Sequence, residues 1–545
     1  MNAPLGSERV PLGSERAPLG QVVVKTLIKR SEYHDSVSLM LAARELSKLE
    51  EVRDAAVVMA TEANKSILAE AGLLTNEAAS ATPNDLLIAV AAGSESAAES
   101  ALQKAESLLQ KKSAASSSSF GQSSAFTPKT LRGALAAQPA ANLAVISVAG
   151  RYAADEAWEA LTRGLHVLLF SDNVTLEDEI ALKQYARDHG LLLMGPGAGT
   201  AILNGVALGF ANVLPRGPVG IVSAAGTGLQ EVSTLIARQG VGVSQGIGVG
   251  GRDLKKEVGG VMMLEGLKAL QQDPATQVIV LVSKPPAEEV AQVILQQVAA
   301  SPKPAVVCFL GGKAPAQTHG AVRFVATLQE CAQVAVQITA EAGAGAAEAG
   351  AVDEQAGLVA QANPLRAKLA PAQRYLRGLF SGGTLCYEAQ VIWKEMGIAS
   401  LYSNAPLPGG LSLPDSTRSQ QHTAVDLGEE EFTVGRPHPM IDNDLRLRRF
   451  WQEARDPETA VILLDVVIGY GAHPNPAAEL APAIRQARQS APRGPLVVAS
   501  VTGTEQDPQR LSVQTAALQE AGAVVCNSNA AAARLAGRIA AGSAA

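Results

Sequence analysis

The feature that most constrains the fold is an apolar run that ends in a small-residue turn and continues into an amphipathic segment. Residues 219–223 have the sequence VGIVS, the turn AAGTG follows at 224–228, and apolar residues then recur at helical spacing. The same order returns at 375–380, which the turn SGGT follows at 381–384. A buried strand that leads through a tight turn into a helix is the unit of a parallel α/β sheet. The sequence therefore predicts two such sheets, the first around residues 219–228 and the second around 375–384.

The chain is divided into several domains, because 545 residues are too many for a single core. Strands and helices alternate between 143 and 194, which predicts a parallel sheet of Rossmann type. Three apolar runs and the helical segments between them predict a small α+β domain, ferredoxin-like in arrangement, at the N-terminus. We predict a disordered tail at 1–20, the small α+β domain at 21–112, a serine-rich linker at 113–128, the Rossmann-like domain at 129–215, an α/β domain at 216–340, an Ala/Gly linker at 341–373 and a second α/β domain at 374–540.

Composition excludes several classes of protein. The formal net charge of −7 gives no electrostatic reason to bind nucleic acid or an anionic membrane. The four cysteines lie far apart without a CxxC pair, which argues against a disulfide framework and a zinc site and favours a reducing, cytoplasmic location. No apolar stretch reaches the roughly 18–20 residues that span a bilayer, and the N-terminal tail lacks the apolar segment of a signal peptide. We expect no bound metal, no nucleic acid and no membrane partner.

The glycine turns are the candidate binding elements. A strand-to-helix turn directs free N–H groups at one point, the helix dipole adds positive potential there, and glycine lets the backbone approach an anion. We predict that three turns bind phosphate or carboxylate: Ala225, Gly226, Thr227 and Gly228; Ser381, Gly382, Gly383 and Thr384; and Thr502, Gly503 and Thr504. Each alone is also an ordinary helix cap, so the prediction depends on their recurrence in two similar units. We expect the first two turns to face one shared pocket.

Three polar side chains are catalytic candidates. Arg436 and His438 lie in the sequence GRPHP, where two prolines fix the backbone and present both side chains from one rigid loop. Arginine suits bidentate capture of phosphate or carboxylate, although a salt bridge from Arg436 to Asp442 is the structural alternative. Arg252 follows two glycines and is the third candidate.

Longer stretches resemble known proteins. PVGIVSAAGTGLQEV (218–232) and GIGVGGRDL (246–254) look like the ligase domain of the succinyl-CoA synthetase α subunit, and residues 374–540 resemble the ligase domain of the β subunit. Residues 21–535 are identified as a member of the FdrA family by YHDSVSLM (33–40), MATEANKSIL (59–68), FSDNVTLEDEI (170–180), GGRDLKKEVGG (250–260), SKPPAE (283–288), TVGRPHPMID (433–442), LLDVVIGYGA (463–472) and VTGTEQDP (501–508). The resemblance implies a multidomain α/β protein. Its parts are a Rossmann-like CoA-binding-type domain at 129–215 and two flavodoxin-like ligase domains at 216–340 and 374–540.

The chain also departs from the synthetase. No segment resembles an ATP-grasp domain, and the glycine-rich CoA loop is missing. His319, in FLGGKAPAQTHGAV (309–322), lacks the glycine pattern of a phosphohistidine, so a surface loop histidine is the favoured interpretation.

The FdrA resemblance implies an oxamate carbamoyltransferase subunit, which transfers carbamoyl between carbamoyl phosphate and oxamate in allantoin catabolism together with other subunits. A site that stabilises phosphate as the leaving group would serve that reaction without a nucleotide. One alternative is an acyl-CoA ligase that takes its ATP-grasp domain from another chain, and a second is a non-catalytic scaffold. We expect carbamoyl phosphate or phosphate as ligand, no permanently bound cofactor, no motif that requires coenzyme A, and assembly both with other subunits and with further copies of the chain.

Overall fold

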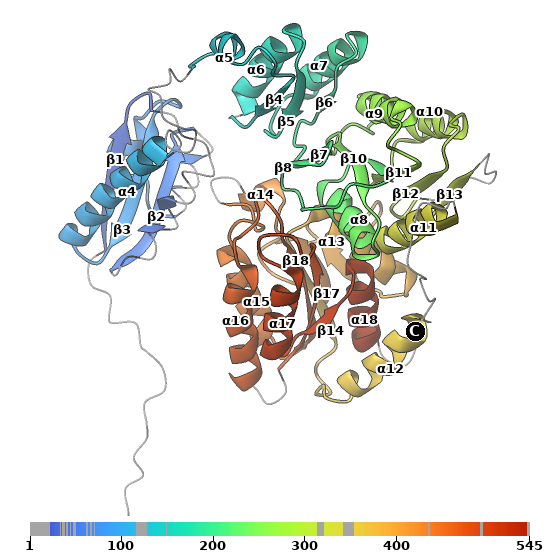
Figure 1. The fold of residues 1–545 in the computed structure, drawn as a ribbon. Helices are drawn as coiled ribbons and strands as arrows, with labels where there is room; N and C mark the ends of the chain where they lie inside the picture. Colours follow the sequence, from blue (N-terminus) through green and yellow to red (C-terminus); the bar gives the residue numbers. More distant parts are fainter. Residues whose placement is uncertain are drawn as a thin grey trace, which may run out of the picture. The chain divides into compact units, whose positions relative to one another are not determined.

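The computed structural model describes residues 22–115, 128–312, 321–341, 354–433, 437–490 and 494–541, except residues 33, 35–38, 40–41, 44, 47–48, 50, 62–63, 66–67, 70 and 149. The chain forms two compact units, one from residues 1–125 with 434–437 and the other from 126–433 with 438–545 (Figure 1). Within the described ranges, no helix is both long and apolar enough to cross a membrane.

The first unit is an antiparallel sheet covered by a long helix. Its strands β1 (Val23–Lys29), β2 (Val52–Met59) and β3 (Leu86–Ala92) lie in the order β1-β3-β2, with β3 antiparallel to both neighbours. α3 (Asn76–Ala79) and α4 (Glu95–Ala115) follow β2 and β3. A central strand between two others that run parallel to each other is the split βαβ arrangement of ferredoxin-like folds. The small α+β domain is confirmed, and the first of the helical segments expected between its apolar runs, residues 35–49, falls largely outside the described residues.

The second unit begins with a short parallel sheet. α5 (Leu131–Ala137) precedes β4 (Leu143–Ile146), α6 (Gly150–Thr162), β5 (His166–Leu169), α7 (Leu176–Asp188) and β6 (Leu193–Met194). The strands are parallel in the order β4-β5-β6, as predicted from the alternating pattern. α7 starts where Thr175 caps it through a hydrogen bond from the Asp178 N–H.

A seven-stranded sheet follows, in the order β13-β12-β11-β9-β10-β7-β8. Its elements are β7 (Thr200–Leu203), β8 (Val206–Gly209), β9 (Val219–Ser223), α8 (Gly226–Arg238), β10 (Val243–Gly248), α9 (Val261–Gln272), β11 (Val278–Ser283), α10 (Glu288–Ala299), β12 (Ala305–Phe309), β13 (Val322–Phe324) and α11 (Leu328–Glu341). β9 to β13 are parallel, whereas the β7–β8 hairpin adds two antiparallel strands that the sequence pattern did not predict.

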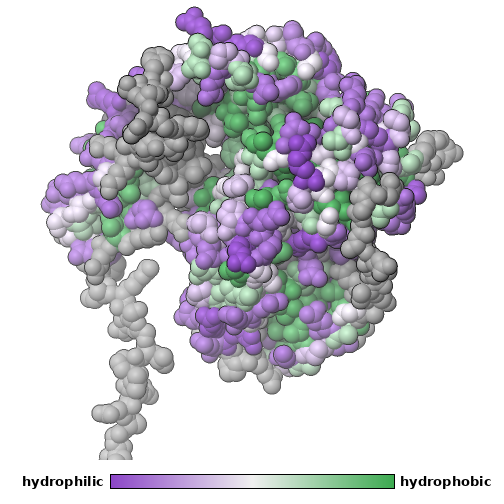
Figure 2. Space-filling view, in the orientation of Figure 1, coloured by the Kyte–Doolittle hydropathy of each residue, from purple (hydrophilic) through white to green (hydrophobic). Residues whose placement is uncertain are grey.

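The last sheet has seven parallel strands in the order β16-β15-β17-β14-β18-β19-β20. After α12 (Glu354–Arg366) come β14 (Tyr375–Phe380), α13 (Gly383–Glu395), β15 (Leu401–Ser403), β16 (Leu411–Ser412), β17 (His422–Asp426), α14 (Glu430–Thr433), α15 (Asp444–Arg455), β18 (Thr459–Val467), α16 (Pro476–Ser490), β19 (Leu496–Thr502), α17 (Leu511–Ala521), β20 (Val524–Cys526) and α18 (Asn529–Ala541). Figure 2 shows largely hydrophilic residues over α15 and α16, as expected of helices that bury one side against a sheet.

The two large sheets are joined by a pseudo-symmetric pair of helices, α8 and α13, which contact each other and share one hydrophobic core. Glu231 is the sixth residue of α8 and accepts a hydrogen bond from the N–H of Asn529, the first residue of α18. Glu388 is the sixth residue of α13 and accepts one from the N–H of Leu328, the first residue of α11. Each half therefore caps the last helix of the other half. The predicted pair of α/β domains is confirmed.

Candidate functional site

Both large sheets have a topological switch point at the carboxyl ends of their strands. In the first sheet the chain leaves β9 toward β10 on one side and leaves β11 toward β12 on the other. In the second sheet the chain diverges in the same way after β14 and β18. Ligands of open parallel sheets bind in the crevice between such diverging turns. The candidate site is therefore the region of residues 224–228, 283–284 and 381–384 and the end of β18.

The N-terminus of α8 is open at the first switch point. Its cap residue, Ala225, has no side-chain hydrogen bond to the helix, and its own N–H is bonded to Ser223 Oγ at 3.0 Å. Gly226, the first helical residue, is exposed, and a Cβ atom there would come no closer than 3.6 Å to a neighbour, Thr200 Oγ1. Gly226 can thus meet an anion from solvent, whereas Thr227 and Gly228 of the same turn are buried. Lys284, which directly follows β11, is exposed and supplies a positive charge on this side of the crevice.

The first turns of α8 and α13 interlock. A Cβ atom at Gly382 would lie 2.8 Å from Thr227 Cγ2, and a Cβ at Gly228 would lie 3.0 Å from Thr384 Cγ2. Each threonine therefore packs against a glycine of the opposite helix start. The structure brings the Ala225–Gly228 and Ser381–Thr384 turns together, and a pocket shared by the two turns stays a prediction.

The N-terminus of α13 differs from that of α8, because a carboxylate of the protein occupies it. Asp465, in the middle of β18, accepts hydrogen bonds from the N–H groups of Ser381 at 2.7 Å and Gly382 at 2.8 Å, and from Ser381 Oγ at 3.0 Å. Arg446 forms an ion pair with the same carboxylate, and both side chains are buried. We predicted that the N–H groups of Ser381 and Gly382 bind an anion, but they donate to Asp465 instead. Only part of this turn therefore remains available to a ligand.

A second carboxyl group lies beside the same turn. Asp426, the last residue of β17, is 3% exposed, and its Oδ1 accepts the Gly428 N–H at 2.9 Å. Its Oδ2 would lie 2.5 Å from a Cβ atom at Gly383. Burial, then the charge of Glu429, raises the pKa of Asp426 to about 7, and the ammonium of Lys284 opposes the rise.

His438 lies on the far side of the same loop. Its Nδ1 accepts the Met440 N–H at 3.2 Å, and its Nε2 would lie 2.8 Å from a Cβ atom at Gly428. Burial, then the charge of Arg446, lowers the pKa of His438 to about 4, so the ring is neutral at physiological pH. The structure therefore places this catalytic candidate near Asp426, whereas Arg436 lies outside the described residues, as does His319.

Arg252 is held by the short parallel sheet. Its Nε pairs with Glu179 at 2.8 Å, and its guanidinium donates to the Val174 carbonyl at 2.8 Å. Glu179 also pairs with the buried Lys183, which pairs with Asp253 at 2.8 Å. These contacts attach the turn after β10 to α7, which is a structural role for Arg252.

The third glycine turn has no helix directly after it. Thr504 N–H donates to Asp507 at 2.7 Å, and Thr504 Oγ1 donates to the Val213 carbonyl at 2.9 Å. Thr502 Oγ1 donates to Glu231, and the Gly503 carbonyl accepts from Arg238 at 2.9 Å. α17 begins only at residue 511, so Thr502, Gly503 and Thr504 lie apart from a helix start and contact protein groups.

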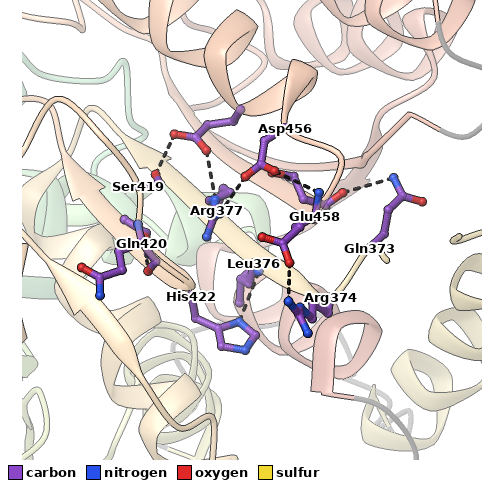
Figure 3. Close-up of polar contacts among 12 residues, drawn as sticks. Gln373, Arg374, Leu376, Arg377, Ser419, Gln420, His422, Asp456 and Glu458 are labelled. Carbon is purple, nitrogen blue, oxygen red and sulfur yellow. Dashed lines mark hydrogen bonds and ion pairs between the residues drawn. The ribbon is translucent and has the colours of Figure 1, made fainter. Parts of the chain in front are cut away.

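A further charged cluster lies at the opposite, amino end of β14 (Figure 3). Arg377 pairs with Glu453 at 3.0 Å and with Asp456 at 2.9 Å. The Leu376 N–H donates to His422 Nδ1 at 3.2 Å, and burial followed by the charge of Arg377 lowers the pKa of His422 to about 4. Because parallel sheets bind ligands at the carboxyl ends, this cluster is structural.

The residues that sequence reasoning missed are Lys284, Asp426 and Asp465. Each had a signal in the sequence: a charged residue inside or directly after an apolar strand, in VIVLVSK, HTAVD and VILLDVV. A charge at such a position must be paired or functional, because burial of an unpaired charge is costly.

Comparison with known proteins defines the class. The description CoA-ligase matches residues 379–539, CoA binding domain matches 216–311, and AllF, heavy metal-associated domain matches 22–126. The chain is thus a multidomain α/β protein of the succinyl-CoA-synthetase-like type. The CoA-binding match covers the sheet around β9, whereas we predicted a CoA-binding-type domain at 129–215.

The chain belongs to the family of YahF of Escherichia coli K12, an uncharacterized protein to which it is 43% identical over 510 residues, 93% of this chain and 96% of YahF. It is also 28% identical over 179 residues to the succinate–CoA ligase α subunit of Methanothermobacter thermautotrophicus, which is 32% of this chain and 59% of that subunit. ATP citrate lyase of Methanothrix soehngenii aligns over 40% of this chain and 38% of that chain, with 24% identity and a TM-score of 0.31. The FdrA label stays a prediction.

The residues present decide which of the implied ligands fit. Residues 22–126 contain no cysteine and one histidine, His34, so they lack the thiolates that a soft-metal site requires. At Gly150, the first residue of α6, a Cβ atom would overlap the Asp172 carbonyl oxygen, so the backbone there packs closely against the protein itself. The open first turn of α8 does fit a phosphate group, from coenzyme A or from an acyl phosphate.

Proposed function

We propose that this chain is a subunit of a CoA-ligase-type complex and transfers an acyl group between a phosphate and an acceptor. The observation that carries the proposal is the exposed, uncapped N-terminus of α8 at the β9/β11 switch point, with Lys284 beside it. In this proposal Gly226–Gly228 hold the phosphate oxygens and Lys284 balances their charge. Coenzyme A, when bound, supplies the accepting thiol. The similarity of residues 216–311 and 379–539 to CoA-binding and CoA-ligase domains supports the assignment.

Transfer of carbamoyl from carbamoyl phosphate to oxamate is the second candidate. Carbamoyl phosphate carries a carbonyl carbon with phosphate as leaving group, so it presents the same reactive unit as an acyl phosphate. The geometry supports it as it supports the first candidate: Asp465 already occupies part of the α13 helix start, so α8 offers the more open anion position. A substrate with one phosphate needs no second anion-binding helix start.

Calorimetric titration of the full chain tests the proposal. Inorganic phosphate, acetyl phosphate, carbamoyl phosphate and coenzyme A are each added to the wild type and to Lys284→Met. We expect phosphate-bearing ligands to bind the wild type and to bind the variant more weakly. Turnover is then compared for acetyl phosphate with coenzyme A and for carbamoyl phosphate with oxamate. A wild-type chain that binds none of the four ligands would contradict both candidates.

A further inference from the structure

Two carboxyl groups lie at the start of α13, in contrasting surroundings. Asp465 accepts two backbone N–H groups and a hydroxyl, and it is paired with Arg446. Asp426 accepts one N–H on Oδ1, and no described residue donates a hydrogen bond to its Oδ2. When the environments of two neighbouring acids differ in this way, one stays ionised and the other is able to hold a proton.

The backbone of Asp426 is fixed, so the position of its side chain is defined. Its N–H donates to Asn404 Oδ1 at 2.9 Å, and its carbonyl accepts from Asn404 Nδ2 at 2.9 Å. The free Oδ2 is directed at the first turn of α13, beside Gly383, which is only half-buried. Because the first turns of α8 and α13 interlock, this oxygen lies at the same crevice as the open helix start of α8.

The charges that act on Asp426 come from three segments of the chain. Glu429 follows on the same loop, Asp465 lies on β18, and both raise the pKa of Asp426. Lys284, after β11, lowers it, and Arg446 faces Asp465 from α15. With burial as the largest effect, the resulting pKa of about 7 suits a group that exchanges protons at neutral pH.

We infer that Asp426 accepts the proton of the attacking nucleophile in the acyl or carbamoyl transfer proposed above, on which this inference rests. The thiol or amide nitrogen forms a bond to the carbonyl carbon, and its proton moves to Asp426 Oδ2. The bond from that carbon to the phosphate oxygen breaks, and the electron pair leaves on phosphate. The protonated Asp426 then returns its proton to solvent. Neither an oxidant nor a nucleotide is needed.

The test compares Asp426→Asn with the wild type in turnover and in phosphate binding. We expect turnover to fall by about 10²–10⁴, as for loss of a general base, while the affinity for inorganic phosphate stays unchanged. Glu429→Gln should shift the acid limb of the kcat profile to lower pH, because it removes a charge that raises the pKa of Asp426. Glu430→Gln, which removes the exposed neighbouring charge, is the matched control and should leave the limb in place.

Infrared difference titration of the full chain gives a second readout that requires no substrate. The wild-type spectrum minus the Asp426→Asn spectrum should contain a protonated carboxyl band that disappears as the pH rises through about 7, whereas the band of Glu388, which also has a pKa of about 7, cancels because both chains contain it. Normal turnover in Asp426→Asn, or no such band below pH 7, would overturn the inference. Failure of the wild type to bind phosphate would instead count against the proposed function, since the band in the wild-type-minus-variant difference reports on Asp426 and requires no ligand.

Discussion

At the scale of single residues, the two glycine turns show how similar sequences reach different states. AAGTG and SGGT both follow a buried strand and both start a helix, which was predictable from the pattern. The turns differ because a protein carboxylate binds the N–H groups of SGGT. This carboxylate belongs to Asp465, which lies 84 residues from Ser381 and accepts its N–H. No local pattern predicts a contact at that separation. The presence of the turns could therefore be predicted, but not which of them is occupied by the protein itself.

The open state of the α8 turn leads to a prediction for two glycines. Gly226→Val should lower turnover by about 10²–10³, the usual effect of losing a preorganised donor, and should leave the melting temperature unchanged because the site is open. Gly228→Val should lower the melting temperature instead, since its Cβ would lie 3.1 Å from Val282 Cγ1 and 3.0 Å from Thr384 Cγ2. Turnover and thermal unfolding are measured for both. Gly357→Val, at a position with no atom within 4 Å, is the control.

At the scale of helices and strands, the prediction from sequence was most successful for long apolar runs. β9 and β14 have the predicted bounds, and α7 lies within residues 143–194, where alternating strands and helices were predicted. The β7–β8 hairpin was missed because its four-residue strands are too short for a periodic signal. The exchange of caps by Glu231 and Glu388 could not be predicted either, since a glutamate within a helix normally faces solvent.

These caps predict a dependence of stability on pH. Burial raises the pKa of Glu388 from 4.5 to about 7, so the folded chain binds this proton more tightly than the unfolded chain does. The free energy of unfolding should therefore fall as the pH rises from 4.5 to about 7, by at most about 3 kcal/mol from this group. Glu388→Gln should reduce the slope, measured as urea midpoints between these pH values. Part of the pH dependence should remain in this variant, because the pKa values of Glu231 and Asp426 are also raised.

The matched control for this prediction is Glu395→Gln, which changes an exposed glutamate on the same helix. In this variant the free energy of unfolding should fall with pH as steeply as in the wild type. A Glu388→Gln variant with an unchanged slope would show that Glu388 is ionised throughout this range in the folded chain.

At the scale of the whole molecule, the chain joins one half that is similar to a CoA-binding domain and one half that is similar to a CoA-ligase domain. The pseudo-symmetric contact of α8 and α13 and the shared core make these halves one compact body. The paired halves were predictable from the repeated strand, turn and helix, and the match of residues 379–539 to a CoA-ligase domain agrees with the resemblance in sequence. The acceptor was not predictable, because specificity depends on side chains that only the folded crevice brings together.

The last prediction concerns nucleotides. No segment of the sequence resembles an ATP-grasp domain, so the full chain by itself should gain no stability from the nucleoside part of ATP. A ligand at a hundredfold excess over its Kd stabilises the folded state by about 2.7 kcal/mol, which a thermal shift assay detects. ATP carries phosphates that can reach the α8 helix start, so tripolyphosphate at equal concentration is the matched control. We expect ATP and tripolyphosphate to give equal shifts, both abolished by Gly226→Val. A shift with ATP that exceeds the shift with tripolyphosphate, and that persists in Gly226→Val, would place a nucleotide site elsewhere on this chain.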